Sequence, residues 1–400
     1  MKKAIAILLA LVLALSLAAC GSNAGTPASQ ESTASQPPAS SADTPDSAPG
    51  NSGASSPAGY LTDNVDHFAR DPYKISYMCL DMASPFMKAM ADGLEAYGKA
   101  LNYEFFGYTA DHDYDAYMSQ LETLADQGYD GVVLGTDASF TYRAYEMAKE
   151  FGLAFVAESE PFRDSSGKCI WPSVAQDQYG NGATTMQWLV DNYSKYWSDP
   201  IDEATLGLII LTFSPVSSIE ERRPGVYDTF VKAFPGAADN VFVGDLVTTP
   251  SGFSAAGGDE LVSGIVPANP QIEKWFIVGL VCDYSLGATR AIERLNKGGS
   301  TLIASIQADN FIADLESGSS GDIWVAACGT SANEATAYMA AGVVAMLDGR
   351  VTPEDLWPEW KSSPDEYALV RLQGTMITKD TYQAWLDDTS LDTLIATIPK

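Results

Sequence analysis

Side chains suited to acid–base or nucleophilic catalysis are few in this sequence and do not form a recognisable catalytic set. His67 and His112 are the two histidines, and His67 precedes the first expected strand. Ser165-Ser166-Gly167-Lys168 matches the Ser-x-x-Lys pattern of β-lactamase-type enzymes, but it lies in a turn-rich loop instead of at a helix start. The sequence contains neither a Gly-x-Ser-x-Gly elbow nor a complete GxxxxGK[ST] phosphate loop. We therefore expect a protein that is not an enzyme and needs no cofactor.

One acidic cluster has a spacing similar to that of a calcium-binding loop. Its members are Asp111, Asp113, Asp115 and Glu122. Ala116 stands where such a loop needs a glycine for its sharp turn, and apolar residues from Met118 to Leu124 follow helical spacing. We interpret the cluster as the acidic start of a helix, where carboxylates favour the helix dipole, and predict no metal site.

Short apolar runs alternate with amphipathic helical patterns along most of the chain. The first expected strand is Ile75 to Leu80, the next helix is Pro85 to Leu101, and the alternation continues to terminal strands at Tyr367 to Val370 and Gly374 to Ile377. Alternation of this kind is typical of βαβ units in a parallel sheet covered by helices on both faces. About a dozen strands exceed what one compact sheet carries, so we expect an α/β protein with two lobes.

The start of the chain has the composition of an export signal followed by a linker. Lys2 and Lys3 precede an apolar run of about 16 residues, which is too short to span a membrane, and residues 1–19 therefore read as a signal peptide. Leu17-Ala18-Ala19-Cys20 resembles the lipobox of bacterial lipoproteins, although an ordinary signal peptide could also end in Cys by chance. We expect a lipidated Cys20 and a disordered tether over residues 20–59, with the protein outside the cytoplasm and anchored to the cell membrane.

Charge and cysteine content narrow the possible partners. The chain of 400 residues has 52 acidic and 23 basic residues and a net charge of −29, which excludes nucleic acid as a partner because binding to phosphates depends on Lys and Arg. The cysteines other than Cys20 are Cys79, Cys169, Cys282 and Cys328. They follow no regular framework, so we favour buried free thiols, although an exported location permits a disulfide.

Five local motifs follow one another along the chain: Ser84-Pro85-Phe86-Met87, Asp126 to Leu134, Asp177 to Gly182, Arg222 to Val226 and Asp283 to Ala288. In this order and at these separations, they resemble the type I periplasmic binding proteins, in particular the ribose/galactose-type sugar-binding branch. The resemblance covers the chain from Tyr73 to Lys400. It implies two parallel-sheet, Rossmann-like lobes joined by crossover hinge strands. Residues 73–171 and 329–363 would form the N-terminal lobe, and residues 172–328 and 364–400 the C-terminal lobe.

The resemblance also implies a function. It indicates the lipoprotein solute-binding component of an ABC transporter: a monomer that captures a small polar ligand, most simply a sugar, in an interlobe cleft and delivers it to an ABC permease. The alternative is a receptor that reports ligand occupancy to a chemoreceptor or a sensor kinase.

The ligand-binding residues implied by the resemblance are ones that can accept, donate or cover the flat face of a sugar. They are Ser84, Phe86, Asp137, Glu158, Arg222, Phe253, Asp283, Gln307 and Asp309. Arg222 is the strongest candidate because its guanidinium can make several fixed hydrogen bonds at once.

Each assignment has a structural alternative. Arg222 could pair with Glu220 or Glu221 on the surface, Phe86 could pack onto the core of its lobe, and Asp283 could cap the following helix. The sequence also departs from the family pattern at Glu158-Ser159-Glu160, at Ser305 to Asp309 and at Cys282. These departures leave the identity of the solute open.

Overall fold

The structure is a computed structural model that describes residues 60, 64–82, 85–137, 139–318 and 322–398. The predicted signal peptide, the lipidated Cys20 and the tether lie outside the described residues, as does Ser84. Among the helices that are described, none has the length and apolar character needed to cross a membrane.

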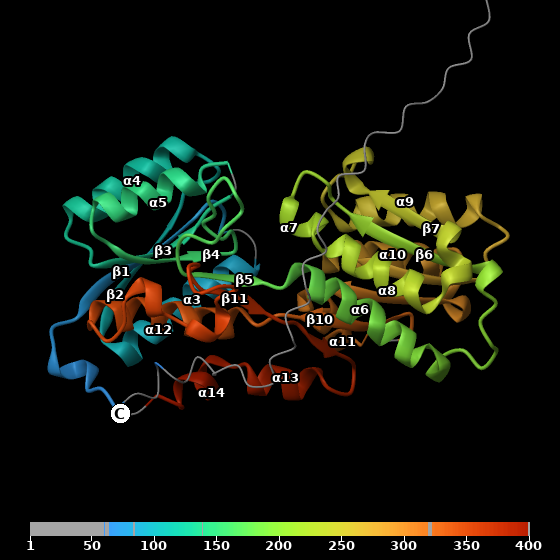
Figure 1. Cartoon of the computed structure of the whole chain (residues 1–400). Coiled ribbons are helices and arrows are strands. Elements are labelled where there is room, and N and C mark those ends of the chain that lie inside the picture. The colour runs from blue at the N-terminus through green and yellow to red at the C-terminus, as the bar shows by residue number, and fades with distance from the viewer. Residues whose placement is uncertain (1–59, 61–63, 83–84, 138, 319–321, 399–400) are drawn as a thin grey trace, which may run out of the picture. The chain divides into compact units, whose positions relative to one another are not determined.

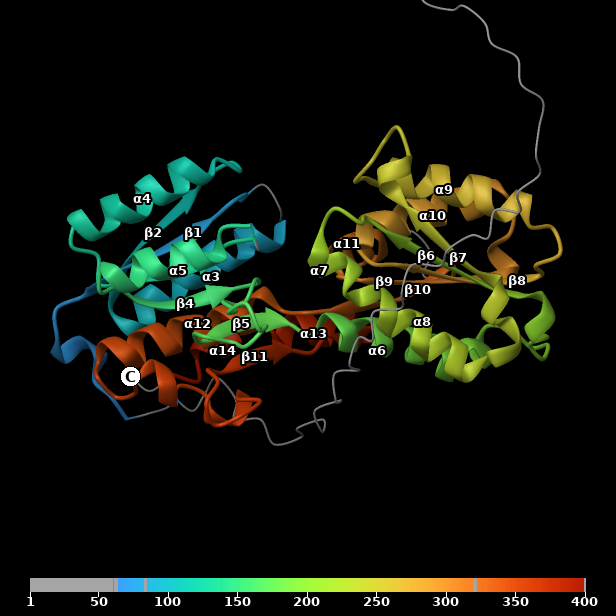
Figure 2. The same cartoon turned by 45° about the horizontal axis from the view of Figure 1, so that its top comes forward.

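Six parallel strands form the sheet of the N-terminal lobe, in the order β11-β5-β4-β3-β1-β2. The strands are β1 (Tyr73–Cys79), β2 (Tyr103–Thr109), β3 (Gly131–Gly135), β4 (Ala154–Glu158), β5 (Ser173–Gln176) and β11 (Leu369–Leu372). The helices are α3 (Pro85–Leu101), α4 (Tyr114–Asp126), α5 (Thr141–Glu150) and α12 (Ala332–Leu347). Figures 1 and 2 show α4 and α5 on one face of the sheet and α3 and α12 on the other.

The central strands of this sheet are apolar at every position because both of their faces are covered. In β3, Val132 and Leu134 belong to the core under α4 and α5, whereas Val133 belongs to the core under α3 and α12. Successive side chains of a strand point to opposite faces, so a continuous apolar run fills two cores at once.

The sheet of the C-terminal lobe has the order β12-β10-β9-β8-β6-β7. Its strands are β6 (Leu206–Thr212), β7 (Val241–Asp245), β8 (Lys274–Gly279), β9 (Thr301–Ile306), β10 (Trp324–Gly329) and β12 (Thr375–Ile377), of which β12 runs antiparallel to β10. Its helices are α6 (Gln178–Asn192), α7 (Ser217–Glu220), α8 (Arg222–Ala233), α9 (Ala255–Ala268), α10 (Cys282–Arg294) and α11 (Asp309–Glu316). The predicted fold class, two parallel-sheet α/β lobes, is confirmed.

Helices α6 and α8 pack at very short range through two glycines. A Cβ atom on Gly182 would lie 2.1 Å from the backbone oxygen of Arg222, and one on Gly225 would lie 2.1 Å from that of Tyr179. Only glycine lets two helix backbones approach so closely. This contact fixes the start of α8, where Arg222 stands, against the start of α6.

The chain passes from one sheet to the other at three places, and Asn181 lies beside the first of them and hydrogen-bonds to the other two. It leaves β5 for α6 at Asp177, leaves β10 for α12 at Thr330, and leaves β11 for β12 at Gly374. The buried side chain of Asn181 accepts from the backbone N–H of Gly374 at 2.7 Å and donates to Thr330 Oγ1 at 3.4 Å.

The first and third changes of sheet come later in the chain than the predicted boundaries at 171/172 and 363/364. The strands β5 and β11 pair with each other in the N-terminal sheet, so residues 173–176 and 369–372 belong to the N-terminal lobe. The difference arises because a short buried strand has the same sequence pattern in either sheet.

Two helices at the end of the chain were not predicted from the sequence. Helix α13 (Tyr382–Asp388) packs on the C-terminal core through Tyr382, Trp385 and Leu386. Helix α14 (Leu391–Ile395) then packs on the N-terminal core against α12 and α3. The chain therefore passes between the lobes a fourth time, and the predicted assignment of 364–400 to the C-terminal lobe is wrong for this last helix.

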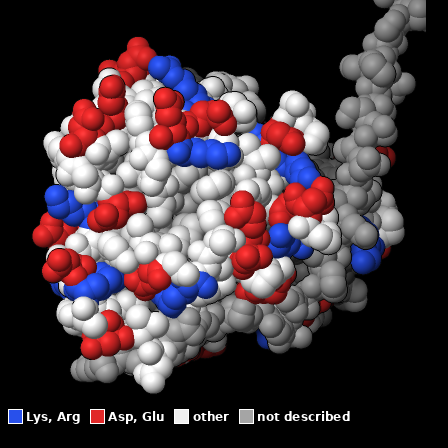
Figure 3. Space-filling model, turned by 60° about the vertical axis from the view of Figure 1, so that its left-hand side comes forward, with Lys and Arg blue, Asp and Glu red and all other residues white. Residues whose placement is uncertain are grey.

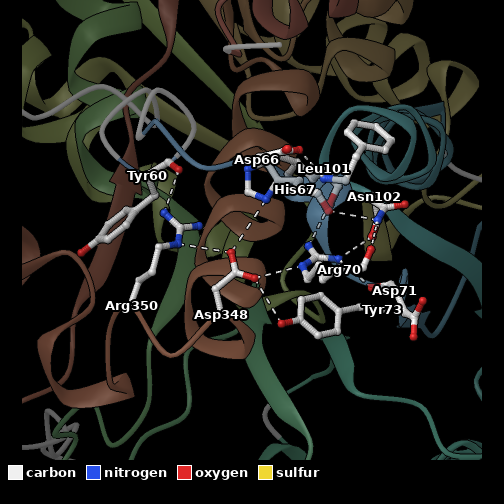
Figure 4. A network of polar contacts seen from close by, with 11 residues as sticks. Tyr60, Asp66, His67, Arg70, Asp71, Tyr73, Leu101, Asn102, Asp348 and Arg350 are labelled. Atoms are coloured by element: carbon white, nitrogen blue, oxygen red, sulfur yellow. Dashed lines mark hydrogen bonds and ion pairs between the residues drawn. The ribbon is translucent and has the colours of Figure 1, made fainter.

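The segment before β1 is held by a polar network around Asp348, at the end of α12 (Figure 4). Asp348 accepts from Arg70 Nε at 3.1 Å, from Tyr73 Oη at 3.1 Å and from Arg350 Nε at 3.2 Å. His67 is buried, with Nδ1 3.8 Å from Asp348, and burial lowers the pKa of its imidazole. The lead-in is thus fixed to the N-terminal lobe at the amino ends of β1 and β2.

Charged residues on one face of the molecule are mixed in sign. Figure 3 shows Lys and Arg side chains lying singly among Asp and Glu side chains on that face, with uncharged residues between them. This face therefore presents no continuous basic surface of the kind that nucleic-acid binding requires.

Candidate ligand-binding site

A cavity of about 220 Å³ lies where strands from both sheets end beside the crossing segments. It is lined by Phe86, Gln176, Gln307, Ala308, Asp309, Ile312, Gly329, Thr330, Trp385 and Leu386. Three of the predicted ligand-binding residues, Phe86, Gln307 and Asp309, thus share one cavity. In α/β folds the carboxyl ends of the strands are the usual place for a ligand.

Arg222 is buried, with 4% of its surface exposed, and its guanidinium is held by uncharged groups. It donates from Nε to Gln178 Oε1 at 2.7 Å, from Nη1 to the carbonyl of Leu280 at 2.6 Å and from Nη2 to Gln176 Oε1 at 3.4 Å. Burial lowers its pKa to about 10.

The surface alternative for Arg222 is wrong. Among the described residues no ion pair includes Arg222, and it is Arg223 that pairs with Glu220 at 2.9 Å. Gln176 lines the cavity and also accepts a hydrogen bond from Arg222. The guanidinium group is therefore separated from the cavity by the side chain of Gln176.

Glu158, at the carboxyl end of β4, is buried with 1% of its surface exposed. It accepts from Tyr77 Oη at 3.2 Å and from the hydroxyl of Ser159. Burial raises the pKa of Glu158 to about 7, although the hydrogen bond from Tyr77 opposes the shift. The carboxyl group is therefore part of the packed interior of the N-terminal lobe.

The residues directly after β4 and β9 have left-handed backbone conformations. Ser159 has φ 63° and Gln307 has φ 71°, and neither is a glycine. Strained backbone of this kind is concentrated at functional sites, where the surrounding structure holds it in place. At Gln307 the backbone N–H donates to the carbonyl of Cys328 at 2.8 Å, and Ser305 Oγ donates to the Gln307 carbonyl at 2.9 Å.

Asp283 stands in the first turn of α10 but does not cap it. The N-cap is Val281, without a side-chain hydrogen bond, so the capping alternative is wrong. Instead, Asp283 Oδ1 accepts from Asn310 Nδ2 at 2.9 Å. Asn310 follows Asp309 in α11, and this contact ties the starts of α10 and α11 together beside the cavity.

The two predicted aromatic contacts have different surroundings. Phe86 packs partly on the N-terminal core and also lines the cavity, so the core-packing alternative and the cavity position both hold. Phe253 is 50% exposed and packs edge-on against Phe213 and Tyr284, with ring centroids 5.2 and 5.4 Å apart. Phe253 does not line the cavity that contains Phe86.

Asp137 lies beside a second, more open hollow of about 750 Å³ in the N-terminal lobe. The hollow is lined by Asp111, His112, Asp113, Tyr114, Asp115, Ser139, Phe140 and Arg143. Asp137 accepts from Tyr114 Oη at 2.7 Å and from the Ser139 backbone N–H at 2.8 Å. Burial alone would raise the pKa of Asp137, but the hydrogen bonds from Ser139 and Tyr114 outweigh burial and lower it.

The four cysteines from Cys79 onward are buried and free, as favoured from the sequence. The described residues contain no cluster of His, Cys, Asp or Glu arranged to hold a metal ion. In particular, Asp113 caps helix α4 by accepting from the Ala116 N–H at 2.9 Å.

Sequence reasoning missed several residues at the cavity. They are Gln176, Thr330, Trp385 and Leu386 in its lining, and Gln178 and Asn310 behind it. Gln178 belongs to the motif Asp177 to Gly182 and Gln176 directly precedes it, so that motif could have pointed to both residues. Trp385 follows no motif, and its place depends on a helix that the sequence did not reveal.

Comparisons with known proteins agree with this architecture. A curated relative, the xylitol-binding protein of Mycolicibacterium smegmatis, is 26% identical over 289 residues, which is 72% of this chain and 74% of the relative. Similar solved structures include a ribose ABC transporter protein from Conexibacter woesei, with a TM-score of 0.59 and 17% identity over 79% of this chain and 95% of that one. A solute-binding protein from Bacillus halodurans with bound myo-inositol has a TM-score of 0.58 and 14% identity over 79% of this chain and 97% of that one.

The family itself follows from the match to a family model. The model of the periplasmic binding protein domain matches residues 75–350, which include most of β1 and all of β2 to β10. The lead-in and the last two strands, β11 and β12, lie outside the match. Members of this family act outside the cytoplasm and bind solutes. The chain belongs to the periplasmic binding protein family.

Proposed function

We propose that this protein is the lipid-anchored, extracytoplasmic solute-binding component of an ABC transporter. It captures a small polyhydroxyl solute, a sugar or a sugar alcohol, delivers it to a membrane permease and catalyses no reaction. The observation that carries the proposal is the cavity at the carboxyl ends of the strands, beside the segments that connect the two sheets.

The lining of the cavity suits a polyhydroxyl ligand. Gln176, Gln307 and Thr330 can both donate and accept, Asp309 accepts, and Phe86 supplies an aromatic ring. A volume of about 220 Å³ is below the roughly 300–1,000 Å³ of most ligand pockets, which favours a solute of monosaccharide size. The xylitol-binding relative supports a pentose or a pentitol within this class.

The connections between the sheets support capture by a hinge motion. Asn181 joins the crossing segments at Thr330 and Gly374, so the segments can bend together as one hinge. A ligand that contacts both lobes only when they are closed shifts the population toward the closed form. The closed form is what a permease would recognise.

A thermal-shift screen tests the proposed function. Full-length protein in detergent is heated with xylitol, D-ribose, L-arabinose, D-glucose, myo-inositol, a nucleoside and a set of amino acids. A true ligand at 100 times its dissociation constant stabilises the fold by about 2.7 kcal/mol. Stabilisation by a sugar or polyol supports the proposal, and stabilisation by an amino acid or nucleoside alone would refute the sugar assignment. Chromatography of the incubated mixture shows whether the ligand is converted. Conversion of the ligand would refute the proposal that the protein catalyses no reaction.

A further inference from the structure

We propose that Trp385, carried by the C-terminal helix α13, is a ligand-contacting and specificity-determining residue of the cavity. The inference rests on the proposed function, because it gives a role to one wall of the same site. The family model ends at residue 350, so this wall comes from a part of the chain that lies beyond the matched domain.

Trp385 lies directly against the end of β10. A Cβ atom on Gly329 would be 3.2 Å from Cζ2 of the indole, which places the ring beside the backbone at the last residue of that strand. Trp385 and Leu386 line the cavity together with Phe86 of α3. The cavity therefore has aromatic rings from α3 and from α13, and polar groups from Gln176, Gln307 and Thr330.

The segment that carries Trp385 is fixed on both sides. Before it, β12 pairs with β10, with Ile377 opposite Ala327. After it, the carbonyl of buried Thr389 accepts from Asn333 Nδ2 of α12 at 2.8 Å. Leu391, Leu394 and Ile395 of α14 then pack on the N-terminal core. With anchors on both cores, the position of the indole does not depend on a free chain end.

The indole of Trp385 also keeps an unused polar group. It is partly exposed, and within the described part of the chain its Nε1–H donates to no acceptor. An indole offers a flat apolar face for the C–H groups of a sugar or polyol and an N–H for a hydroxyl oxygen. Replacing it with a smaller side chain enlarges the cavity, so we infer that Trp385 limits the size of the solute.

Calorimetric titration of the full-length protein in detergent tests this role. Wild type, Trp385→Ala, Trp385→Phe and the control Trp360→Ala are titrated with xylitol, D-ribose and myo-inositol. Trp360 is a suitable control because it is also partly buried but packs on the N-terminal core and does not line the cavity. For the solute that binds wild type, we expect Trp385→Ala to raise the dissociation constant at least about tenfold. Trp385→Phe retains most of the affinity, and Trp360→Ala leaves it unchanged.

The outcomes separate this inference from the proposed function. Equal affinities for Trp385→Ala and wild type would overturn the role of Trp385 while leaving sugar binding established. If wild type binds none of the three solutes, the sugar assignment weakens, and acrylamide quenching of tryptophan fluorescence decides the position of Trp385. A smaller quenchable fraction in Trp385→Phe than in wild type supports an indole facing the cavity. An unchanged fraction overturns it.

Discussion

At the scale of single residues, Arg222 combines a buried charge with incomplete use of its hydrogen-bonding capacity. Three of its N–H groups are bound by Gln178, Leu280 and Gln176. A guanidinium has five N–H donors, so two remain for another partner. Its lowered pKa of about 10 records the cost of burial, yet the group stays charged at neutral pH. A ligand hydroxyl next to Gln176 would find a strong donor there.

Replacing Arg222 with methionine is expected to abolish ligand binding with only a modest effect on the unliganded fold. The lost hydrogen bonds cost roughly 1–3 kcal/mol, and removal of the desolvated charge offsets part of this loss. We expect the free energy of unfolding to change by less than about 2 kcal/mol, measured by urea denaturation, while the ligand-induced thermal shift disappears. Arg223→Met is the control, because Arg223 is half exposed and its pair with Glu220 contributes at most about 1 kcal/mol. A thermal shift that persists in Arg222→Met would remove Arg222 from the site.

Glu158 predicts a pH dependence of stability. Its carboxyl group titrates near pH 4.5 in the unfolded chain and at about pH 7 in the folded protein. Between these values the folded state binds more protons than the unfolded state, so stability decreases as pH rises from about 4.5 to about 7. Glu158→Gln keeps the shape of the protonated acid, and we expect it to be more stable than wild type at pH 8 by roughly 2–3 kcal/mol.

Urea unfolding at pH 5, 6, 7 and 8 measures this difference. The two proteins should have similar stability at pH 5 and diverge above it. Glu104→Gln, an exposed position in β2 of the same lobe, provides the control and should follow wild type. If the free energies of unfolding of Glu158→Gln and wild type depend on pH in the same way, folding does not raise the pKa of Glu158, and the prediction is wrong.

The sequence predicted part of this site and missed the rest for a physical reason. Phe86, Gln307 and Asp309 were named through the resemblance to the family, and each lies near the end of a strand that the apolar pattern predicts. Phe253 also follows a strand and a turn, but the structure packs it on Phe213 and Tyr284 away from the cavity. Local sequence places a residue on an edge, whereas only tertiary packing decides which residues on that edge meet.

At the scale of elements, the contact between α6 and α8 positions the first hinge connection and Arg222 together. We expect Gly182→Ala to destabilise the protein by about 1–3 kcal/mol, because the added methyl group would meet the Arg222 carbonyl at 2.1 Å and push the helices apart. Because Arg222 begins α8, ligand affinity should fall as well.

Gly264→Ala is the matched control for this prediction. Gly264 is an exposed glycine of helix α9, and a Cβ atom there would meet nothing within 4 Å. The substitution should stabilise the protein by about 0.5–1 kcal/mol. Chemical denaturation measures both variants, and a Gly182→Ala protein as stable as wild type would contradict the close helix contact.

Most elements could be predicted from the sequence because buried strands and amphipathic helices leave strong periodic signals. Helix α4, for example, was expected from its apolar spacing, and its buried residues are Tyr117, Met118, Leu121 and Leu124. The short helices α13 and α14 have seven and five residues and gave no such signal. Their structure depends on docking to two existing cores, which the local sequence does not encode.

At the scale of the whole molecule, Cys20 predicts where the protein resides in the cell. When the full-length chain is expressed in a bacterium, we expect wild type in the membrane fraction and Cys20→Ser in the soluble fraction, because the acyl chains would be absent. The ligand affinity of the two proteins should agree, since the cavity is built from residues 86 to 386. Ser22→Ala serves as the control and should stay with the membrane. A Cys20→Ser protein that remains membrane-bound would rule out lipidation at this residue.

The Asp348 network gives the proposed anchor a mechanical consequence. The tether expected from the sequence precedes the lead-in and β1, in which Arg70 and Tyr73 bind Asp348. A force transmitted through the tether would act on the contacts of Arg70 and Tyr73 with Asp348, at the amino ends of β1 and β2. The cavity lies at the opposite, carboxyl ends of the strands. With the proposed anchor, the N-terminal lobe would be the one held near the membrane, and the C-terminal lobe would move relative to it during ligand capture and release.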